Sequence, residues 1–291
     1  MARKRKGRPV HGWVVIDKAP GLTSTQVVGR VRRLLDAQKA GHAGTLDPLA
    51  TGVLPVALGE ATKTVPYVVD GPKRYVFTVR FGEARTTDDA EGEVSETSDV
   101  RPTDEAIAAA LPGFTGRISQ APPAYSAVKI DGQRSYKRAR AGEDAAPAPR
   151  EVEIHDFQLT ARPDADHAVF EVTCGKGTYV RSLARDLSRA LGTVGFVADL
   201  RRTATGPFEE SDAISLDQLA ESVVSAPQQD CLLPVTTALD DIPALALTGR
   251  EADRLRSGQP VPVLRTDNRA CIADLSDGAT LYAMSDGKPI A

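Results

Sequence analysis

The stretch GHAGTLDPLATG occupies residues 41–52 and places one carboxylate, Asp47, in a tight turn between glycines and a proline. The uncharged residues VLPVALG follow at 53–59 and predict a buried segment directly after the turn. A carboxylate held beside buried apolar groups costs stability unless it has a partner or a task. We therefore take Asp47 as the first candidate functional residue. The alternative is an Asx-turn, in which the aspartate only caps its own backbone before a proline.

The sequence on both sides of this turn predicts a mixture of strands and helices. Strands are expected at 12–17, 75–81 and 168–174, the last two from alternating apolar residues. Helices are expected after Thr23, which begins a capping-box sequence, and over 178–191. Because strands and helices do not alternate regularly, the expected fold class is α+β rather than a doubly wound parallel sheet.

Length and composition bound the class of protein. The 291 residues suit one large domain plus a small one, and 41% hydrophobic residues are typical of a globular protein. The charge-free stretch at 48–59 is shorter than the about 20 apolar residues of a membrane helix, so no membrane partner is expected. Cys174, Cys231 and Cys271 are far apart and fit neither a metal site nor a disulfide framework. We expect reduced thiols in a cytoplasmic protein that needs no metal and no redox cofactor.

The net charge of -3 argues weakly against a nucleic-acid partner, but the charges are segregated along the chain. Bases exceed acids by 11 to 4 in residues 1–63, by 7 to 3 in 117–150 and by 6 to 2 in 176–202. Acids exceed bases by 9 to 2 in residues 82–105, and residues 203–246 hold 8 acids and no lysine or arginine. Such segregation is typical of a one-sided phosphate-binding face. Separate solvated surfaces would explain it equally well.

Six segments in chain order, between residues 10 and 206, resemble the motifs of the TruB family of tRNA pseudouridine synthases. They are VIDKAPGLTS at 15–24, GHAGTLDPLATG at 41–52, KRY at 73–75, PPAYSAVK at 122–129, GKGTYVRSL at 175–183 and LRRT at 200–203. One departure is visible, because the family's first motif usually reads Lys-Pro-x-Gly and this chain has Lys18-Ala19-Pro20-Gly21. The displaced proline still allows a turn at this position.

The resemblance implies an isomerase that converts uridine 55, in the T arm of tRNA, to pseudouridine. It implies a mixed-sheet catalytic domain over residues 10–240, preceded by a basic flexible arm at 1–9. The Pro-, Gly- and base-rich residues 114–150 are expected to form an excursion that grips RNA. By position, 245–291 resemble the small β-rich PUA-type RNA-binding domain that often ends this family.

The resemblance also assigns roles to single residues. Asp47 is the expected nucleophile, and Arg181 is its expected partner, countering the rise in pKa that an apolar pocket imposes on a carboxyl group. Tyr75 is expected to stack on the target base and to take part in proton removal. Without the resemblance, Tyr75 would be interpreted as a core residue at a strand end and Arg181 as a surface arginine.

The remaining assignments concern substrate binding. Tyr179 and Leu200 resemble residues that line the base pocket. His42 could be a general base, but the family suggests that it fills the space that the flipped base vacates. Phosphate contacts are expected from three lysines, namely Lys18, Lys63 and Lys129.

Other classes of function compete with this one. A non-catalytic RNA-binding or RNA-folding protein on the same scaffold would not need the full set of Asp47, Tyr75 and Arg181. A guide-RNA-dependent relative, working inside a ribonucleoprotein, tends to carry longer extensions than this compact chain. A Ser-His-Asp hydrolase has little support, because no Gly-x-Ser-x-Gly motif is present. We therefore expect tRNA as the partner, with no obligate protein partner.

Overall fold

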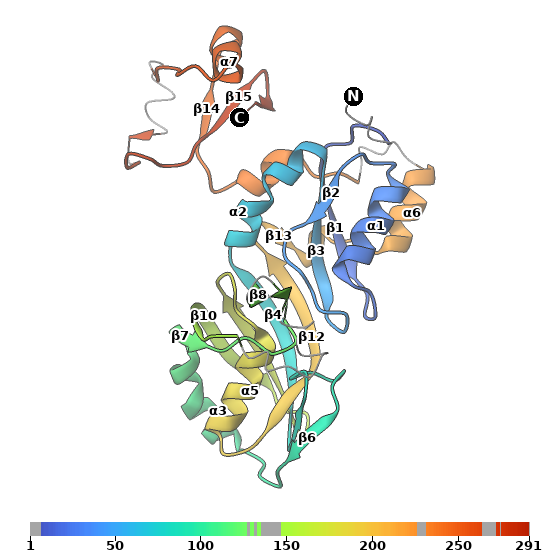
Figure 1. Ribbon diagram of the computed structural model, residues 1–291, viewed down its shortest axis with the longest axis vertical. Helices are drawn as coiled ribbons and strands as arrows, with labels where there is room; N and C mark the ends of the chain where they lie inside the picture. The colour runs from blue at the N-terminus through green and yellow to red at the C-terminus, as the bar shows by residue number, and fades with distance from the viewer. Residues whose placement is uncertain are drawn as a thin grey trace.

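The computed structural model describes residues 7–126, 129–130, 133–134, 147–225, 231–263, 272–273 and 275–290, with the backbone alone at 129–130 and 133–134. A nine-stranded sheet forms the body of the molecule, in the order β1-β3-β12-β4-β11-β10-β7, with β2 paired to β3 and β13 to β12 (Figure 1). Its strands are β1 (Gly12–Lys18), β2 (Ala40–His42), β3 (Thr51–Leu58), β4 (Lys73–Phe81), β7 (Gly116–Gln120), β10 (Arg150–Ala161), β11 (His167–Cys174), β12 (Gly195–Thr205) and β13 (Phe208–Glu209). Two hairpins lie outside this sheet, β5 (Glu83–Arg85) with β6 (Val94–Thr97) and β8 (Lys129–Ile130) with β9 (Gln133–Arg134).

The sheet is mixed, and its one parallel pairing joins β3 to β12. β12 runs parallel to β3, with Arg201 opposite Thr51 and Arg202 opposite Gly52. The remaining pairs in this sheet, such as β1 with β3 and β4 with β12, are antiparallel. The predicted α+β class with a mixed sheet is therefore confirmed. The parallel junction brings the start of β3, and with it the turn that precedes it, against the LRRT segment of β12.

Two pairs of helices cover the sheet. α1 (Ser24–Leu34) and α6 (Leu216–Ser225) lie side by side near β1 and β3, whereas α3 (Asp104–Ala110) and α5 (Val180–Ala190) lie in the other half (Figure 1). The short helix α2 (Val65–Asp70) precedes β4. The predicted cap of α1 is confirmed, because the Thr23 hydroxyl accepts a hydrogen bond from Gln26 N and the Gln26 side chain accepts one from Thr23 N.

Apolar side chains from the alternating strands form the main core. Phe77, Phe157 and Phe170 pack ring to ring between β4, β10 and β11, with centroids 5.4–6.0 Å apart. On the other face, Trp13 of β1 packs on Phe208 of β13 with centroids 5.1 Å apart. The sheet thus has a buried apolar cluster on each side, and this rigid frame supports the loops at the strand ends. Among the described residues, no helix is long and apolar enough to cross a membrane.

The C-terminal residues form a separate small unit beyond α2 (Figure 1). It contains β14 (Ala244–Ala246), β15 (Tyr282–Ser285) and β16 (Lys288–Pro289) in one sheet, with α7 (Gly249–Arg256) beside β15. The predicted small β unit is confirmed, but α7 was not predicted. Its signal was present, because Thr248 and Glu251 form the reciprocal hydrogen bonds of a capping box.

Candidate active site

The turn that carries Asp47 lies between β2 and β3 and is held on both sides by buried side chains. The Ser24 hydroxyl, at the start of α1, accepts from Leu46 N at 2.9 Å and donates to Leu46 O at 3.0 Å. On the other side, Lys18 Nζ donates to Pro48 O at 3.0 Å. The residues before and after Asp47 are therefore fixed independently. The carboxylate itself stays reachable, because its side chain is 34% exposed.

The glycines of this turn are required by the strand that packs against it. Gly44 and Gly52 have φ angles of +92° and +95°, which residues with a Cβ rarely adopt. A Cβ at Gly52 would lie 2.2 Å from Arg202 O, and one at Gly44 would lie 3.1 Å from Arg202 Nη1. Side chains at these two positions would push the Asp47 turn away from β12.

Arg181 connects Asp47 to the rest of the site. Its Nε lies 3.0 Å from Asp47 Oδ2, and Nη1 lies 3.1 Å from Asp89 Oδ2. Nη1 also donates to Thr87 O at 2.9 Å, and Nη2 donates to Tyr125 O at 3.1 Å. The Arg181 and Asp89 side chains are 5% and 2% exposed. The guanidinium is thus held by a buried carboxylate and two carbonyls, in addition to its contact with Asp47.

The electrostatic environment of Asp47 reflects these partners. Burial raises the pKa of the Asp47 carboxyl, and the charge of Arg181 opposes that rise. Asp89 raises the pKa further and Lys18 lowers it. Arg181 therefore favours the charged, nucleophilic form of a carboxyl group that its surroundings would otherwise push toward protonation.

Tyr75 lies on β4, opposite Arg202 of β12 and Val172 of β11. Burial raises the pKa of its phenol, and the neighbouring Arg202 opposes this by its charge and by hydrogen bonding. Arg202 also donates to Gly44 O in the Asp47 turn and so links Tyr75 to that turn, and the charge of Asp47 contributes to the raised pKa of Tyr75. The structure therefore groups Asp47, Arg181 and Tyr75, which come from a turn, a helix and a strand.

The expected base-pocket residues lie on elements that border this group. Tyr179 is the N-cap residue of α5, and the Gln120 side chain fixes its backbone by donating to Tyr179 O and accepting from Tyr179 N. The Tyr179 ring lies under the Arg150 guanidinium, 5.1 Å from its centroid. Leu200, on β12, is buried opposite Phe77.

His42 is the last residue of β2, five positions before Asp47. Burial lowers the pKa of its imidazole, and the charge of Arg202 lowers it further. Its Nδ1 is buried and has no hydrogen-bond partner among the described residues. A neutral imidazole suits a role in filling space better than a role as a cation.

The three lysines expected to contact phosphate differ in their surroundings. Lys18 is fully buried, and its Nζ donates to the carbonyl oxygens of Ala19, Leu22 and Pro48, so no donor is left for a phosphate. Burial lowers its pKa to about 8. We therefore correct this expectation: Lys18 ties the first motif to the Asp47 turn. Lys63 is exposed and pairs with Glu60 at 2.6 Å, and the side chain of Lys129 lies outside the described residues.

The departure from the usual first motif leaves this connection intact. Gly21 N donates to Pro48 O at 2.8 Å, and Lys18 Nζ reaches Ala19 O and Leu22 O within the same turn. The proline at position 20 therefore still permits the contacts between residues 18–22 and the residue after Asp47.

Sequence reasoning missed three residues of the site. Asp89 belongs to the acidic residues 82–105, which a solvated surface would explain from the sequence alone, yet it is buried against Arg181. Gln120 lies two residues before the quoted PPAYSAVK segment, and Arg202 is part of the quoted LRRT segment. The only available signal for the last two was their place in or beside a motif. Asp89 had no local signal, because its partner is 92 residues away in the sequence.

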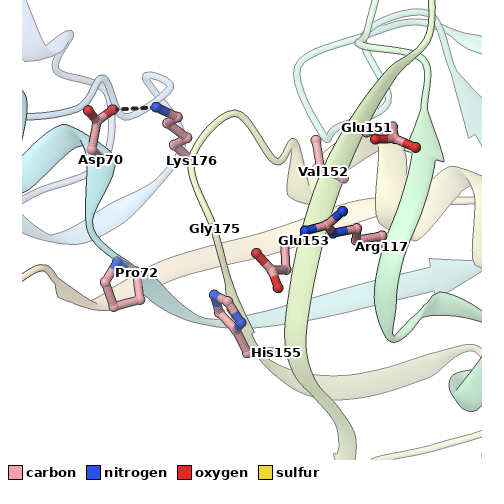
Figure 2. Close-up of a pocket in the computed structure, with 9 residues that line it drawn as sticks. All are labelled: Asp70, Pro72, Arg117, Glu151, Val152, Glu153, His155, Gly175 and Lys176. Atoms are coloured by element: carbon pink, nitrogen blue, oxygen red, sulfur yellow. Dashed lines mark hydrogen bonds and ion pairs between the residues drawn. The ribbon is translucent and has the colours of Figure 1, made fainter. Parts of the chain in front are cut away.

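A separate hollow of about 400 Å³ lies on the face of β10 that bears Glu151, Glu153 and His155 (Figure 2). Arg117, Gly175 and an ion pair between Asp70 and Lys176 line it as well. None of the candidate site residues lines this hollow, so it is distinct from the Asp47 group. Among the described residues, no three His, Cys, Asp or Glu side chains are grouped as metal ligands would be.

Known proteins match both the sequence and the fold. Residues 32–180 match the TruB family pseudouridylate synthase N-terminal domain, and residues 181–240 match the tRNA pseudouridylate synthase B C-terminal domain. The tRNA pseudouridine synthase B of Gluconacetobacter diazotrophicus is 62% identical over 263 residues, which cover 90% of this chain and 86% of that protein. The tRNA pseudouridine synthase B of Rhodospirillum rubrum is 54% identical over 293 residues, which cover 100% and 94%.

Among solved structures, the Cbf5-Nop10-Gar1 complex contains a chain with the same fold. It aligns with a TM-score of 0.72 and 26% identity, covering 96% of this chain and 76% of that chain. Sequence identity over nearly the whole chain, two matched domain families and a shared mixed-sheet fold all point to one family. The chain therefore belongs to the TruB family of tRNA pseudouridine synthases.

Proposed function

We propose that this tRNA pseudouridine synthase acts on uridine 55 in the T arm, with Asp47 as the nucleophile. The observation that carries the proposal is the reachable Asp47 carboxylate, 3.0 Å from an Arg181 guanidinium that Asp89 and two carbonyls hold from behind. This arrangement supplies a charged nucleophile inside a site that burial would otherwise neutralise.

The reaction is an isomerisation, so the residues present can account for it. The N1–C1′ bond breaks, the uracil rotates, and a C5–C1′ bond forms, while C5 loses a proton and N1 gains one. The Asp47 carboxylate can attack the ribose C1′ or the uracil C6, or remove a proton from the sugar. In each case Arg181 stabilises the carboxylate without competing as a nucleophile, because a guanidinium stays protonated.

The target uridine must leave the folded T arm before Asp47 can reach it, at a cost of a few kcal/mol. We assign Tyr75 to stacking on the extruded base and to removing the C5 proton, and Tyr179 and Leu200 to the walls of the base pocket. His42, kept neutral by burial and by Arg202, takes the place of the base in the RNA stack.

Contacts to RNA phosphates must offset the cost of extrusion. Four exposed arginines, Arg8, Arg30, Arg32 and Arg33, form no ion pair among the described residues. The last three lie on α1, whose first residue, Ser24, holds the Asp47 turn. We assign these arginines to the phosphates of tRNA, together with Lys63, Lys129, the 114–150 segment and the C-terminal unit.

The position of the modified uridine can be tested with matched RNA substrates. Purified protein is incubated with an unmodified tRNA transcript, with the same tRNA carrying cytidine at position 55, and with an isolated T-arm hairpin. We expect one new pseudouridine in the first and third RNAs and none in the second. A product at another position would contradict the assignment of uridine 55. Failure on bare tRNA with retained binding would contradict action without a protein or guide-RNA partner.

A further inference from the structure

Arg202 is a buried cation to which the proposed reaction gives no part in positioning Asp47 or Tyr75. Its side chain is 1% exposed, and no carboxylate of the described residues lies within ion-pair distance of it. A buried, unpaired guanidinium is costly to maintain, because its lost hydration must be replaced inside the protein. Its neighbour Arg201 behaves differently. Arg201 points to the opposite face of the sheet and pairs with Asp17 at 3.0 Å and with Glu210 at 2.5 Å.

The hydrogen bonds of Arg202 bracket the Asp47 turn. Its Nη2 donates to Gly44 O at 3.1 Å, three residues before Asp47. Its Nε donates to Val53 O at 2.8 Å, six residues after Asp47. One guanidinium therefore holds both ends of the turn, and the fork of an arginine can make the two contacts at once, whereas a lysine cannot.

Arg202 also faces the other reactive group of the site. It is the direct cross-strand partner of Tyr75, and side chains at such positions point to the same face of the sheet. Its charge and hydrogen bonding oppose the rise in the Tyr75 pKa that burial causes. A base for the C5 proton gains from this effect, because a phenol whose pKa is raised by burial alone would ionise less readily.

We propose that Arg202 is a positioning residue for this reaction, because its guanidinium joins the Asp47 turn to the Tyr75 phenol and fixes the two relative to each other. The proposal rests on the proposed roles of Asp47 and Tyr75. It also explains why the motif needs glycine at 44 and 52, since both residues pass close to Arg202. Misplacement of reacting groups by about 1 Å can cost about 100-fold in rate.

The test compares Arg202→Met and Arg202→Lys with Arg201→Met as the matched control. Melting temperatures first establish that each variant folds. Single-turnover rates and tRNA affinities are then measured separately. We expect Arg202→Met to lose about 100-fold in rate while keeping its affinity for tRNA. Arg202→Lys should recover part of the rate, and Arg201→Met should change little, because its ion pairs are exposed.

A second readout follows the phenol directly and does not depend on activity. In protein labelled with 13C at the tyrosine Cζ, the Tyr75 signal is assigned by its loss in Tyr75→Phe and then titrated. We expect the Tyr75 pKa to rise in Arg202→Met and to stay unchanged in Arg201→Met. An unchanged Tyr75 titration in a folded Arg202→Met protein would overturn the proposal, even if the rate falls.

If Arg202→Met does not fold, the reciprocal measurement uses Tyr75→Phe. The side-chain Nε signal of Arg202 should shift when the phenol is removed, and an unchanged signal would refute the link. These spectra also separate two failures. If the wild-type protein makes no pseudouridine at position 55, the proposed function fails, whereas the contact between Arg202 and Tyr75 is still judged by the spectra.

Discussion

Two segments of this chain are both rich in basic residues, but their charges have different surroundings in the fold. One is 176–202, and the other runs from Arg8 to the arginines of α1. Residues 176–202 contain six lysines and arginines, and each of them has a partner inside the protein. The ion pairs are Lys176 with Asp70, Arg181 with Asp47 and Asp89, Arg185 with Asp88 and Asp186, Arg189 with Glu96, and Arg201 with Asp17 and Glu210, whereas Arg202 donates to carbonyl groups. In contrast, Arg8, Arg30, Arg32 and Arg33 are exposed and form no ion pair among the described residues.

The difference corrects one interpretation of the charge pattern. From the sequence alone, the excess of bases in 176–202 could form part of a phosphate-binding face or a separate solvated surface. In the structure, the acidic β5–β6 region folds against α5 and supplies the acids that pair with its arginines. Charge that is segregated along the sequence is here neutralised in space. Of the two segments, only the one that contains Arg8 and the arginines of α1 has exposed bases without an ion pair among the described residues. The two segments therefore serve different purposes, one internal and the other suited to RNA.

The largest expected effect comes from removing Arg181, the buried arginine that pairs with both Asp47 and Asp89. Arg181→Met leaves the buried Asp89 carboxylate without its partner, which should cost about 3–5 kcal/mol in the free energy of unfolding. Activity should fall by about 1000-fold or more, because Asp47 loses the cation that favours its charged form. Chemical denaturation and single-turnover rates measure both effects. A stable and active variant would show that the internal role assigned to this segment is wrong.

A second prediction concerns pH. The proposed reaction needs a charged Asp47, so activity is expected above the pKa of that carboxyl group and is expected to be lost as pH falls through that pKa. Because the charge of Asp89 raises the pKa of Asp47, Asp89→Asn should move the acidic limb of the rate profile to lower pH. Arg181→Lys, which keeps the charge, serves as the control. An acidic limb that moves to higher pH would mean that Asp89 acts mainly by holding Arg181.

Substitutions in the segment from Arg8 to the arginines of α1 should change RNA affinity and leave the stability of the protein nearly unchanged. The double variant Arg30→Ala, Arg33→Ala should weaken tRNA binding and reduce the slope of log affinity against log salt by about 1 for each phosphate that is no longer bound. Its melting temperature should stay close to that of the wild type, because both side chains are exposed. If the slope of log affinity against log salt is unchanged, α1 is not part of the RNA-binding surface.

The smallest effect is expected at an exposed member of the internal segment. Arg189 pairs with Glu96 at 2.5 Å, but both side chains are about half exposed. Arg189→Ala should therefore cost no more than about 1 kcal/mol in the free energy of unfolding and leave the salt dependence of tRNA binding unchanged. A reduced salt slope in this variant would mean that Arg189 contacts RNA phosphate, which would contradict the internal role of residues 176–202.

The sequence predicted those features that depend on local pattern. The strands at 12–17, 75–81 and 168–174 and the helix at 178–191 are present as β1, β4, β11 and α5. The first is buried along nearly its whole length, and the other three have an apolar period and a buried face. The Asp47 turn was identified because its glycines and proline limit the backbone. The contact between Asp47 and Arg181 could be expected only from the family resemblance.

Features that depend on distant partners could not be predicted. Asp89 looked like one of many solvated acids until α5 placed Arg181 against it. Lys18 looked like a phosphate contact, although three carbonyls surround its ammonium group. Nothing in the order of residues shows that Arg201 is partly exposed and Arg202 is buried, since that follows from the register of β12 between β3 and β4.

The most direct test of the account is pseudouridine mapping on an unmodified tRNA transcript with the wild-type protein and with Asp47→Asn. Asparagine keeps the size of the side chain and removes its charge, so the variant should still bind tRNA. We expect one pseudouridine at position 55 with the wild type and none with the variant, at equal tRNA affinity. A variant that still forms pseudouridine would contradict the role of Asp47 as nucleophile. A variant that loses affinity together with activity would instead indicate that Asp47 serves mainly in RNA binding.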